Sequence, residues 1–302
     1  MPDMRRILFV TLSNIGDAVM TTPVLDSLQR MYPQARFDIV ADARSAALFE
    51  HFPALDEIIL KHKNAGWRDR LAFVARLRRK RYDLIVDLRT DGLAWLLRAR
   101  RRLNKVQRTP DSHSVEQHFK AIAPLLGQLD LPPARLWIPE TAHARADQWL
   151  AALPGSRWLA LGPGANWEGK IWAAERFVSL VGQCADAFDG VILLGGAADS
   201  ARVAGMIGAL PLPCLDLTGN TSLLEAAAVL ARARLFVGND SGLGHLASAV
   251  NTPTLTLFGP GEPLRYRPWG DKARWLAAPQ QDLAQLPVER VLVELNAMLE
   301  RA

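Results

Sequence analysis

The stretch that most constrains the fold of this chain covers residues 235–249 and reads LFVGNDSGLGHLASA. An apolar run passes directly into small and polar residues at 239–242, and a helical pattern that carries His245 follows. A turn of this kind, from a strand into a helix, leaves several backbone N–H groups without partners inside the helix. The stretch therefore predicts a parallel α/β sheet that can hold an anionic group at the end of one strand.

A second turn of the same kind lies near the start of the chain. Residues 7–12 form an apolar strand pattern, residues 13–17 (SNIGD) form the turn, and a helical pattern covers residues 18–31. Open parallel sheets bind their ligands at the carboxyl ends of the strands. Two such turns, far apart in the sequence, predict two α/β domains that face one central cleft.

Short apolar runs alternate with helical patterns in both halves of the chain, which is typical of doubly wound parallel sheets. The alternation predicts a helix over residues 93–103. Residues 131–139 interrupt it with three prolines, and we place the linker region there. We therefore expect an α/β protein with two Rossmann-like domains, at 1–150 and 151–285, and a C-terminal helix within 286–302.

The composition is that of an enzyme-sized protein. The chain has 302 residues, 49% of them hydrophobic, which suits two domains with sizeable cores. No apolar run approaches the roughly 20 residues that span a bilayer, and no signal-peptide pattern is present, so we expect a cytoplasmic protein. Cys184 and Cys214 are too few for a disulfide framework or a zinc site, and no metal site is expected.

Positive charge is concentrated in one part of the sequence. Residues 61–108 contain 16 basic and four acidic residues, whereas the whole chain has a net charge of only +5. One interpretation is a solvated face of basic helices. The other is an electrostatic field that attracts a phosphorylated lipid, an acidic sugar or a nucleic acid. Both interpretations remain open at this point.

Several motifs, in their order and spacing, resemble those of one family over nearly the whole chain. They are RRILFVTLSNIGDAVMTTP at the N-terminus, LALGPGANWEGKIWAAERF in the middle, LLGGAADS, and a block that runs from LTGNTSLLEAAA through GNDSGLGH to LFGPGEP. The chain resembles the ADP-heptose:lipopolysaccharide heptosyltransferases of glycosyltransferase family 9. This resemblance implies a GT-B architecture, in which the C-terminal domain holds the nucleotide sugar, the N-terminal domain holds the acceptor, and the last helix packs back on the N-terminal domain.

The donor site implied by the resemblance needs groups that stabilise a departing diphosphate. Lys170 would supply a positive charge, and the N–H groups of Ser241 and Gly242 would add fixed dipoles, so that no metal is required. Trp167 and Trp172 either shield the phosphates or pack in the core, and core packing suits Trp172 better. The donor-binding residues implied by the motifs are Gly164, Ala165, Lys170, Gly196, Asp199, Leu217, Thr218, Gly219, Asp240, Ser241, Gly242 and His245.

Single residues in this set also have simpler interpretations. The family usually has glutamate near the position of Asp199, so a contact between Asp199 and the ribose is an open point. Asp240 is equally compatible with a helix cap, and His245 with a packed structural residue. Turn chemistry explains the glycine-bearing loops about as well as direct contact with a ligand does.

The resemblance makes Asp17 the candidate general base and Lys170 the second catalytic residue. Asp17 lies at a helix start, where the helix dipole favours a carboxylate, and a weak base still works when the acceptor proton moves late. Without the resemblance, Asp17 is an ordinary acidic residue in the first turn of a helix. The acceptor-binding candidates are Ser13, Asn14, Gly16, Lys61, Lys63, Arg68, Arg98 and Arg101.

The expected activity is the inverting transfer of heptose from ADP-heptose to the anionic inner core of lipopolysaccharide. The expected partners are the nucleotide-sugar donor, the anionic lipopolysaccharide-precursor acceptor and the inner-membrane surface, to which the protein binds peripherally as a monomer; no nucleic acid is expected. No cofactor is required, and a role for a divalent ion stays open. The alternatives are another sugar donor or a protein acceptor, a non-catalytic nucleotide-binding protein, and an oxidoreductase, although residues 13–16 lack the G-x-G-x-x-G fingerprint.

Overall fold

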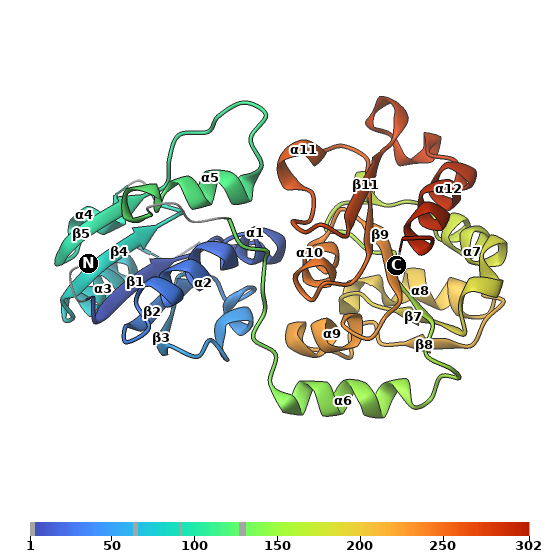
Figure 1. Cartoon of the computed structure of the whole chain (residues 1–302), viewed down its shortest axis with the longest axis horizontal. Helices are drawn as coiled ribbons and strands as arrows, with labels where there is room; N and C mark the ends of the chain where they lie inside the picture. Colours follow the sequence, from blue (N-terminus) through green and yellow to red (C-terminus); the bar gives the residue numbers. More distant parts are fainter. Residues whose placement is uncertain (1–3, 63–65, 91, 127–130, 302) are drawn as a thin grey trace. The chain divides into compact units, whose positions relative to one another are not determined.

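Two compact units make up the chain, and Figure 1 shows a sheet flanked by helices in each. Contacts within the chain group Met1–Trp137 into the first unit and Ile138–Ala302 into the second. This division lies earlier than the boundary expected after residue 150. The structure is a computed structural model that describes residues 4–62, 66–90, 92–126 and 131–301.

The first unit contains a five-stranded parallel sheet in the order β3-β2-β1-β4-β5. Strand β1 is central, and four of its five residues are buried because helices cover both faces of the sheet. The strand order changes direction between β1 and β4, which is where open parallel sheets bind ligands. The strands are β1 (Arg6–Val10), β2 (Arg36–Ala41), β3 (Leu55–Leu60), β4 (Tyr82–Asp87) and β5 (Ala99–Asn104).

The helix predicted over residues 18–31 is interrupted, so that prediction was wrong at one point. Thr21 Oγ1 donates to the Ala18 carbonyl at 2.7 Å, and Pro23, in the first turn of the next helix, has no N–H with which to continue the first. The helices of this unit are α1 (Ile15–Val19), α2 (Thr22–Met31), α3 (Trp67–Arg78), α4 (Leu93–Leu96) and α5 (Ser114–Lys120), with the short 3₁₀ helices η1 (Ala46–Phe49) and η2 (Ala123–Leu125).

The segment 93–103 was predicted as one helix, and this prediction was also wrong. The segment forms the short helix α4 and then β5, which pairs with β4 at the edge of the sheet. Charged side chains are common on edge strands, where they discourage pairing with other chains. Arg102 donates from Nε to the Ala94 carbonyl at 2.9 Å and from Nη2 to the Leu97 carbonyl at 2.8 Å. The basic run therefore lies along a sheet edge and caps α4.

The second unit contains a six-stranded parallel sheet in the order β11-β10-β9-β6-β7-β8. The order changes direction between β6 and β9, as it does between β1 and β4 in the first unit. Strand β11 was not expected from the sequence, since its half-buried residues ARWLA show no alternation of apolar and polar side chains. The strands are β6 (Trp158–Gly162), β7 (Gly190–Leu193), β8 (Cys214–Asp216), β9 (Leu235–Asn239), β10 (Thr254–Phe258) and β11 (Ala273–Ala277).

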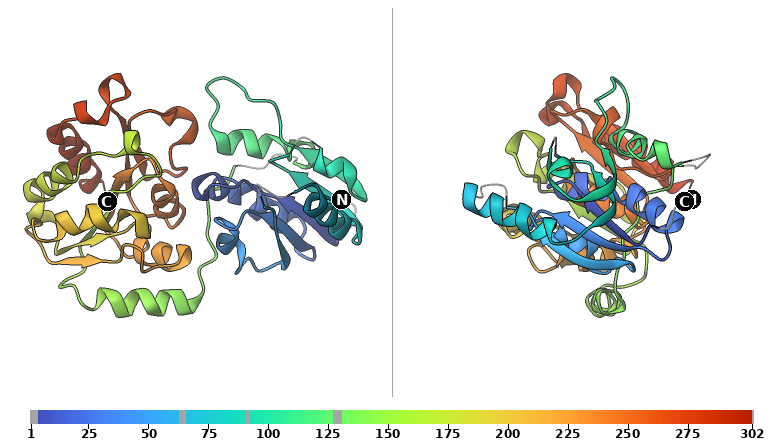
Figure 2. Two further views of the ribbon diagram at one scale, coloured as in Figure 1. Left: turned by 180° about the vertical axis from the view of Figure 1, so that it is seen from behind. Right: turned by 90° about the vertical axis from the view of Figure 1, so that its left-hand side faces the viewer.

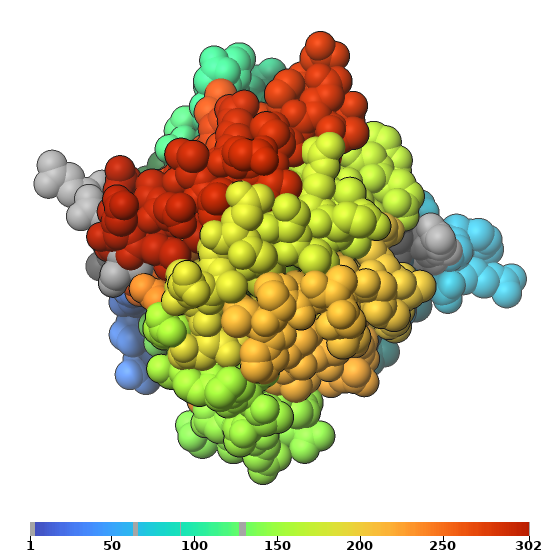
Figure 3. Space-filling model, turned by 90° about the vertical axis from the view of Figure 1, so that its right-hand side faces the viewer, coloured from blue at the N-terminus to red at the C-terminus, as the bar shows by residue number. Residues whose placement is uncertain are grey.

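Helices α7, α8 and α12 lie together on one face of the second unit, which Figure 3 shows. Val291, Leu295 and Met298 of α12 enter the core of this unit. The apolar face of the C-terminal helix, expected on the N-terminal domain, thus packs in the second unit. The helices are α6 (Glu140–Leu150), α7 (Ala174–Gln183), α8 (Ser200–Ile207), α9 (Leu223–Leu230), α10 (Gly242–Ala249), α11 (Pro263–Tyr266) and α12 (Val288–Leu299), with η3 (Glu168–Lys170), η4 (Ala185–Ala187), η5 (Ala197–Asp199), η6 (Pro279–Gln281) and η7 (Leu283–Gln285). Of the helices that the structure describes, none has the length and apolar character to cross a membrane.

Helix α6 belongs to the second unit, although the predicted boundary placed it in the first. It packs along α9 and buries Ala146 and Leu150. Arg232, just beyond α9, donates from Nη2 to Asp147 Oδ2 at 2.8 Å and from Nη1 to His143 Nδ1 at 3.0 Å. These contacts connect residues far apart in the sequence, so a local pattern of prolines could not reveal them.

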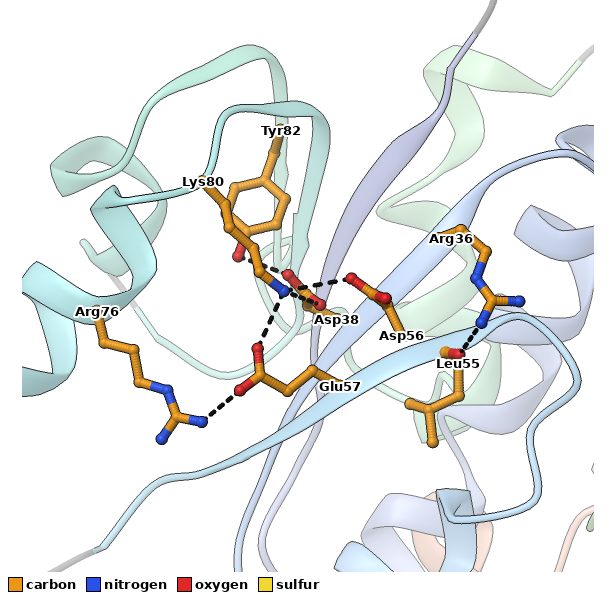
Figure 4. A network of polar contacts seen from close by, with 8 residues as sticks. All are labelled: Arg36, Asp38, Leu55, Asp56, Glu57, Arg76, Lys80 and Tyr82. Carbon is orange, nitrogen blue, oxygen red and sulfur yellow. Dashed lines mark hydrogen bonds and ion pairs between the residues drawn. The ribbon is translucent and has the colours of Figure 1, made fainter.

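A polar network joins the end of α3 to the sheet of the first unit (Figure 4). Lys80 donates to three carboxylates: Asp38 at 2.8 Å, Glu57 at 3.0 Å and Asp56 at 3.3 Å. Tyr82 Oη donates to the other oxygen of Asp38 at 2.9 Å. Burial alone would lower the pKa of Lys80, but its hydrogen bonds to Asp38 and Glu57 outweigh that effect and raise the pKa. The network therefore neutralises Asp38, which is fully buried in β2.

Candidate active site

The predicted donor-binding residues meet at the carboxyl edge of the sheet in the second unit. They lie in the loops and helix starts that follow β6, β7, β8 and β9, which are neighbours in the sheet. All strands of a parallel sheet end at the same edge, so segments distant in sequence come together there. After β6 come Gly164, Ala165 and Lys170; after β7, Gly196 and Asp199; after β8, Leu217, Thr218 and Gly219; and after β9, Asp240, Ser241, Gly242 and His245.

Asn239, the last residue of β9, connects three segments of this edge. Its Oδ1 accepts a hydrogen bond from the Trp172 N–H at 3.0 Å, and its Nδ2 donates to the Pro163 carbonyl at 2.8 Å. Asn239 is fully buried, and both ends of its amide are satisfied. This role of Asn239 was not predicted. The available signal was an amide side chain at the end of a buried strand, beside a carboxylate.

Lys170 and Asp240 form an ion pair, with 2.5 Å between Nζ and Oδ2. Lys170 ends the turn η3, and Asp240 follows β9 directly, so the pair connects two of the converging loops. Both residues are partly buried. An ammonium group held in such a position suits a phosphate group, because Lys binds phosphate as a compact point charge. Over the ranges that the structure describes, no three His, Cys, Asp or Glu residues are grouped as a metal site would require.

The start of α10 offers backbone donors beside this ion pair. Ser241 is the N-cap residue, but among the described residues its hydroxyl makes no capping bond, and its buried Oγ has no hydrogen-bond partner. The first turn of α10 contains no acidic side chain either. An uncapped helix start with an unsatisfied buried hydroxyl is suited to an anion. His245 is buried within α10 one turn further on.

The loop after β7 packs closely against the loop after β6. A Cβ atom on Gly164 would lie 2.2 Å from Asp199 Cγ, so only glycine permits this approach. Asp199 Oδ2 accepts a hydrogen bond from the Gly196 N–H at 2.9 Å and thereby caps the turn η5. The carboxylate of Asp199 thus has a structural role in its own loop, whatever its contact with a ribose.

The loop after β8 completes the edge. Gly219 has a φ of +74°, a left-handed conformation that favours glycine, and its N–H donates to the Gly195 carbonyl at 3.0 Å. Leu217 and Thr218 are buried, and the buried Oγ1 of Thr218 has no hydrogen-bond partner among the described residues. A second unsatisfied hydroxyl therefore lies at this edge, together with that of Ser241.

Two further features of the Lys170 loop emerge from the structure. Trp172 is fully buried, which confirms the core interpretation, whereas Trp167 is exposed. Arg202 of α8 donates to Glu168 Oε1 at 2.8 Å and ties the turn η3 to α8. Arg202 was not predicted, because the pair joins residues 34 positions apart and no local pattern marks it.

The predicted base and its neighbours lie at the carboxyl edge of the sheet in the first unit. Asp17 lies in α1, directly after the loop that contains Ser13, and is half-buried like Gly16. Asn14 Nδ2 donates to Asp17 Oδ2 at 2.9 Å. At the end of the neighbouring strand β4, the buried Asp87 accepts hydrogen bonds from the N–H groups that follow it in its own turn. Asp87 was not predicted, although its position at a strand end was the available signal.

Some of the basic candidates lie at this edge as well. Lys61 directly follows β3, and Arg68 is exposed near the start of α3. Burial and then the charge of Arg89 lower the pKa of Lys61, whereas the charge of Asp87 opposes this shift. Lys63 lies outside the described residues. Lys61 and Arg68 thus come to the same edge of the sheet as Asp17.

Arg98 and Arg101 do not join them. Arg98 immediately precedes β5, and its carbonyl accepts a hydrogen bond from the N–H of Tyr82 at the start of β4. It is therefore placed at the amino edge of the sheet, opposite the loop that contains Asp17. Arg101 lies within β5 and donates to the Pro124 carbonyl at 2.8 Å.

Comparison with known proteins gives the family. Residues 90–292 match the family described as Glycosyltransferase family 9 (heptosyltransferase). The chain is 29% identical over 343 aligned positions to lipopolysaccharide heptosyltransferase 2 of Escherichia coli (strain K12), with 97% of this chain and 98% of the relative covered. It is 30% identical over 301 positions to lipopolysaccharide heptosyltransferase 1 of Pseudomonas aeruginosa, with 85% and 79% covered.

Solved structures share the fold. The structure of the E. coli ADP-heptose lps heptosyltransferase II matches with a TM-score of 0.81 at 27% identity, covering 98% of this chain and 99% of that one. A glycosyl transferase family 9 structure from Veillonella parvula matches with a TM-score of 0.85 at 21% identity, covering 99% and 98%. These matches identify the chain as a transferase, in place of the oxidoreductase and non-catalytic alternatives. The chain therefore has the GT-B fold and belongs to glycosyltransferase family 9, the heptosyltransferases.

Proposed function

We propose that this protein transfers heptose from ADP-heptose to a hydroxyl group on the anionic inner core of lipopolysaccharide, with inversion at the anomeric carbon. The observation that supports this most directly is the ion pair of Lys170 and Asp240 beside the start of α10. It combines an ammonium group with backbone N–H donors at the edge of the sheet where α/β proteins bind nucleotides.

The second unit would assist the departure of ADP. As the bond between the anomeric carbon and the phosphate oxygen breaks, negative charge grows on the diphosphate. Lys170 Nζ and the N–H groups of Ser241 and Gly242 would stabilise that charge. Because Lys170 pairs with Asp240 in this structure, the diphosphate would share the ammonium with a carboxylate, and the pair would hold the ammonium in position before the donor arrives.

The first unit would activate the acceptor. Asp17 would take the proton of the acceptor hydroxyl as its oxygen attacks the anomeric carbon from the face opposite the departing phosphate. Attack from that face inverts the configuration. The hydrogen bond from Asn14 orients the carboxylate of Asp17 for this step.

The acceptor would carry phosphates and carboxylates, and the excess of basic residues in the segment 61–108 supports this choice. Lys61 and Arg68 are the described basic candidates at the edge that bears Asp17. We propose that the protein works as a monomer, peripherally bound at the cytoplasmic face of the inner membrane, without a cofactor.

The test is an assay with the purified full-length chain, ADP-heptose and an acceptor of lipid A that carries the acidic core sugars. ADP should be released only when both substrates are present, and NMR of the product should show an anomeric configuration opposite to that of the donor. Parallel reactions with and without a chelator decide whether a divalent ion takes part. Turnover with a different nucleotide sugar, or transfer to a protein, would establish the alternative instead.

A further inference from the structure

One side of α3 carries four apolar residues, and the first unit covers only those of the carboxyl half. The apolar stripe consists of Trp67, Leu71, Val74 and Leu77, at the i, i+4, i+7 and i+10 spacing of a helix face, and Arg70 and Arg78 interrupt it. Leu77 is buried in the core of the first unit, and Val74 packs against that core. Trp67 and Leu71 continue the stripe toward the amino end of the helix and are 68% and 62% exposed.

The two halves of α3 are also anchored differently. Arg76 pairs with Glu57, and Lys80 with Asp38, so ion pairs fix the carboxyl half to the sheet (Figure 4). Residues 67–72 are all exposed. Figure 2 shows the helix standing out from the rest of the first unit. The amino half of α3 therefore presents apolar side chains that this unit does not cover.

Helix α4 also carries exposed apolar side chains. Its residues Leu93 and Ala94 share a core cluster with α3, and the two helices are in contact. Trp95 and Leu96 are left 67% and 53% exposed. Of the nine large apolar side chains that are exposed among the described residues, five lie at positions 60–96. Exposed apolar side chains are thus concentrated in this part of the sequence.

Basic side chains accompany these apolar ones. The guanidinium carbon of Arg68 lies 5.3 Å from the ring centre of Trp67, and that of Arg102 lies 5.6 Å from the ring of Trp95. One carboxylate, Asp69, lies in the first turn of α3. Tryptophan, leucine and arginine side chains are common where a protein meets the interface of a bilayer. The surplus of positive charge is complementary to anionic lipid headgroups.

We propose that the apolar surface formed by Trp67 and Leu71 inserts into an anionic phospholipid bilayer. Helix α3 starts shortly after β3, at the same edge of the sheet as Asp17. Insertion would therefore hold the proposed acceptor-activating edge next to the membrane that carries a lipid-linked acceptor. The inference extends the proposed function in this respect, but binding to lipid does not depend on the transfer reaction.

Cosedimentation of the full-length protein with vesicles tests the proposal. The wild type should bind vesicles of phosphatidylethanolamine and phosphatidylglycerol. The double variant Trp67→Gln/Leu71→Gln should bind about tenfold more weakly, since it removes much of the apolar area that insertion buries. The matched control is Val293→Gln, which changes an apolar residue 69% exposed on α12 and should bind like the wild type.

Substitution of basic residues distinguishes insertion of the apolar side chains from electrostatic attraction alone. Arg68→Gln/Arg70→Gln should weaken binding to the anionic vesicles and reduce its sensitivity to salt, while the small residual binding to phosphatidylcholine vesicles stays unchanged. The proposal is overturned if the wild type does not bind anionic vesicles, or if Trp67→Gln/Leu71→Gln binds them equally well. It is also overturned if sedimentation velocity shows a dimer that this double variant abolishes, because a second copy would then cover the surface.

An acceptor without acyl chains separates this inference from the proposed function. Trp67→Gln/Leu71→Gln should match the wild type with that water-soluble acceptor and should lose about tenfold in rate on vesicles that contain the lipid-linked one. Failure of the wild type to turn over either acceptor would refute the proposed function while leaving the vesicle-binding result intact. Equal rates of variant and wild type on vesicles would refute the inference alone.

Discussion

The two strand-to-helix turns that indicate the fold in the sequence are constructed differently in the structure. Asn239, in the turn after β9, forms side-chain hydrogen bonds with residues 67 and 76 positions away. Asn14, in the turn after β1, donates to Asp17, three positions away. The turn after β9 thus depends on hydrogen bonds between distant segments. In the turn after β1, the hydrogen bond from Asn14 to Asp17 is local, and Ser45 Oγ donates to the Leu12 carbonyl, 33 positions away, at 3.2 Å.

This difference suits the different tasks that the proposed function gives to the two turns. A diphosphate must be met by charges and dipoles that are already in place, because reorganising them during the reaction would cost free energy. Distant segments that brace β9 and η3 provide such a framework. A general base needs one carboxylate within reach of a proton, and the five-residue helix α1 can supply it with local support. Substitutions should therefore separate activity from stability at Asp17 and affect both near Asn239.

The largest effect is expected for Asp17→Asn. Loss of the general base should reduce turnover by about 10³-fold, which corresponds to about 4 kcal/mol in the activation free energy. The affinity for ADP-heptose, measured by calorimetry, should stay the same, and so should the free energy of unfolding. Asn14→Ala, which removes the orienting hydrogen bond, should cost about tenfold in turnover. Wild-type turnover in Asp17→Asn would exclude Asp17 as the base and remove the contrast between the turns.

Lys170→Met should have the next largest effect. It removes the ammonium that would stabilise the leaving diphosphate, and kcat should fall by about 10²-fold, a loss of about 2.7 kcal/mol. The affinity for ADP should fall as well, unlike in Asp17→Asn. A double-mutant cycle with Asp240→Asn measures the coupling through the ion pair. If Lys170→Met binds ADP and turns over like the wild type, Lys170 has no role in stabilising the leaving group.

Much of the donor edge was predictable because its signals are local. The end of an apolar run fixes where a strand stops, and the small residues at 240–242 mark a helix start whose N–H groups have no partners. Lys170 and Gly164 were implied by the resemblance, and both lie in the loop after β6. The hydrogen bonds of the Asn239 side chain and the pair of Arg202 and Glu168 were not predictable, since each depends on which strands become neighbours.

The basic segment shows the limit of composition more clearly. Lys61 and Arg98 contribute equally to its charge, but one follows a strand and the other precedes one, so they are at opposite edges of the sheet. The helical interpretation of 93–103 failed for a related reason. Arg and Leu suit a helix by propensity, whereas pairing with β4 made residues 99–104 an edge strand. Charge and helix propensity are properties of a segment by itself, whereas its position in the fold follows from the order of the strands in the sheet.

Asn239→Ala tests whether the distant contacts at the donor turn also stabilise the fold. The substitution leaves the Trp172 N–H and the Pro163 carbonyl without their side-chain partner in a buried site. We expect the free energy of unfolding to fall by about 2 kcal/mol, measured by urea denaturation. Asn220→Ala is the control, because Asn220 is exposed and donates to a single carbonyl nearby, and it should change stability little. Equal stability of the two variants would show that the hydrogen bonds of Asn239 do not stabilise the second unit.

The smallest effect is expected for Glu57→Gln, at the distant contacts that the first unit does have. Among these contacts are those at the end of α3, where hydrogen bonds from Arg76 and then Lys80 lower the pKa of Glu57. The stabilisation is therefore fully present above the ordinary glutamate pKa of about 4.3 and is lost as the pH falls through the lowered pKa. Because Glu57 is partly exposed, we expect Glu57→Gln to cost only about 0.5 kcal/mol at neutral pH, where Glu289→Gln, on the exposed side of α12, should cost less. Urea denaturation of the wild type and Glu57→Gln at neutral and acid pH measures the difference in their free energies of unfolding. This difference should shrink as the pH falls. A difference that stays constant would mean that the packing of α3, and not its ion pairs, fixes the carboxyl half of the helix.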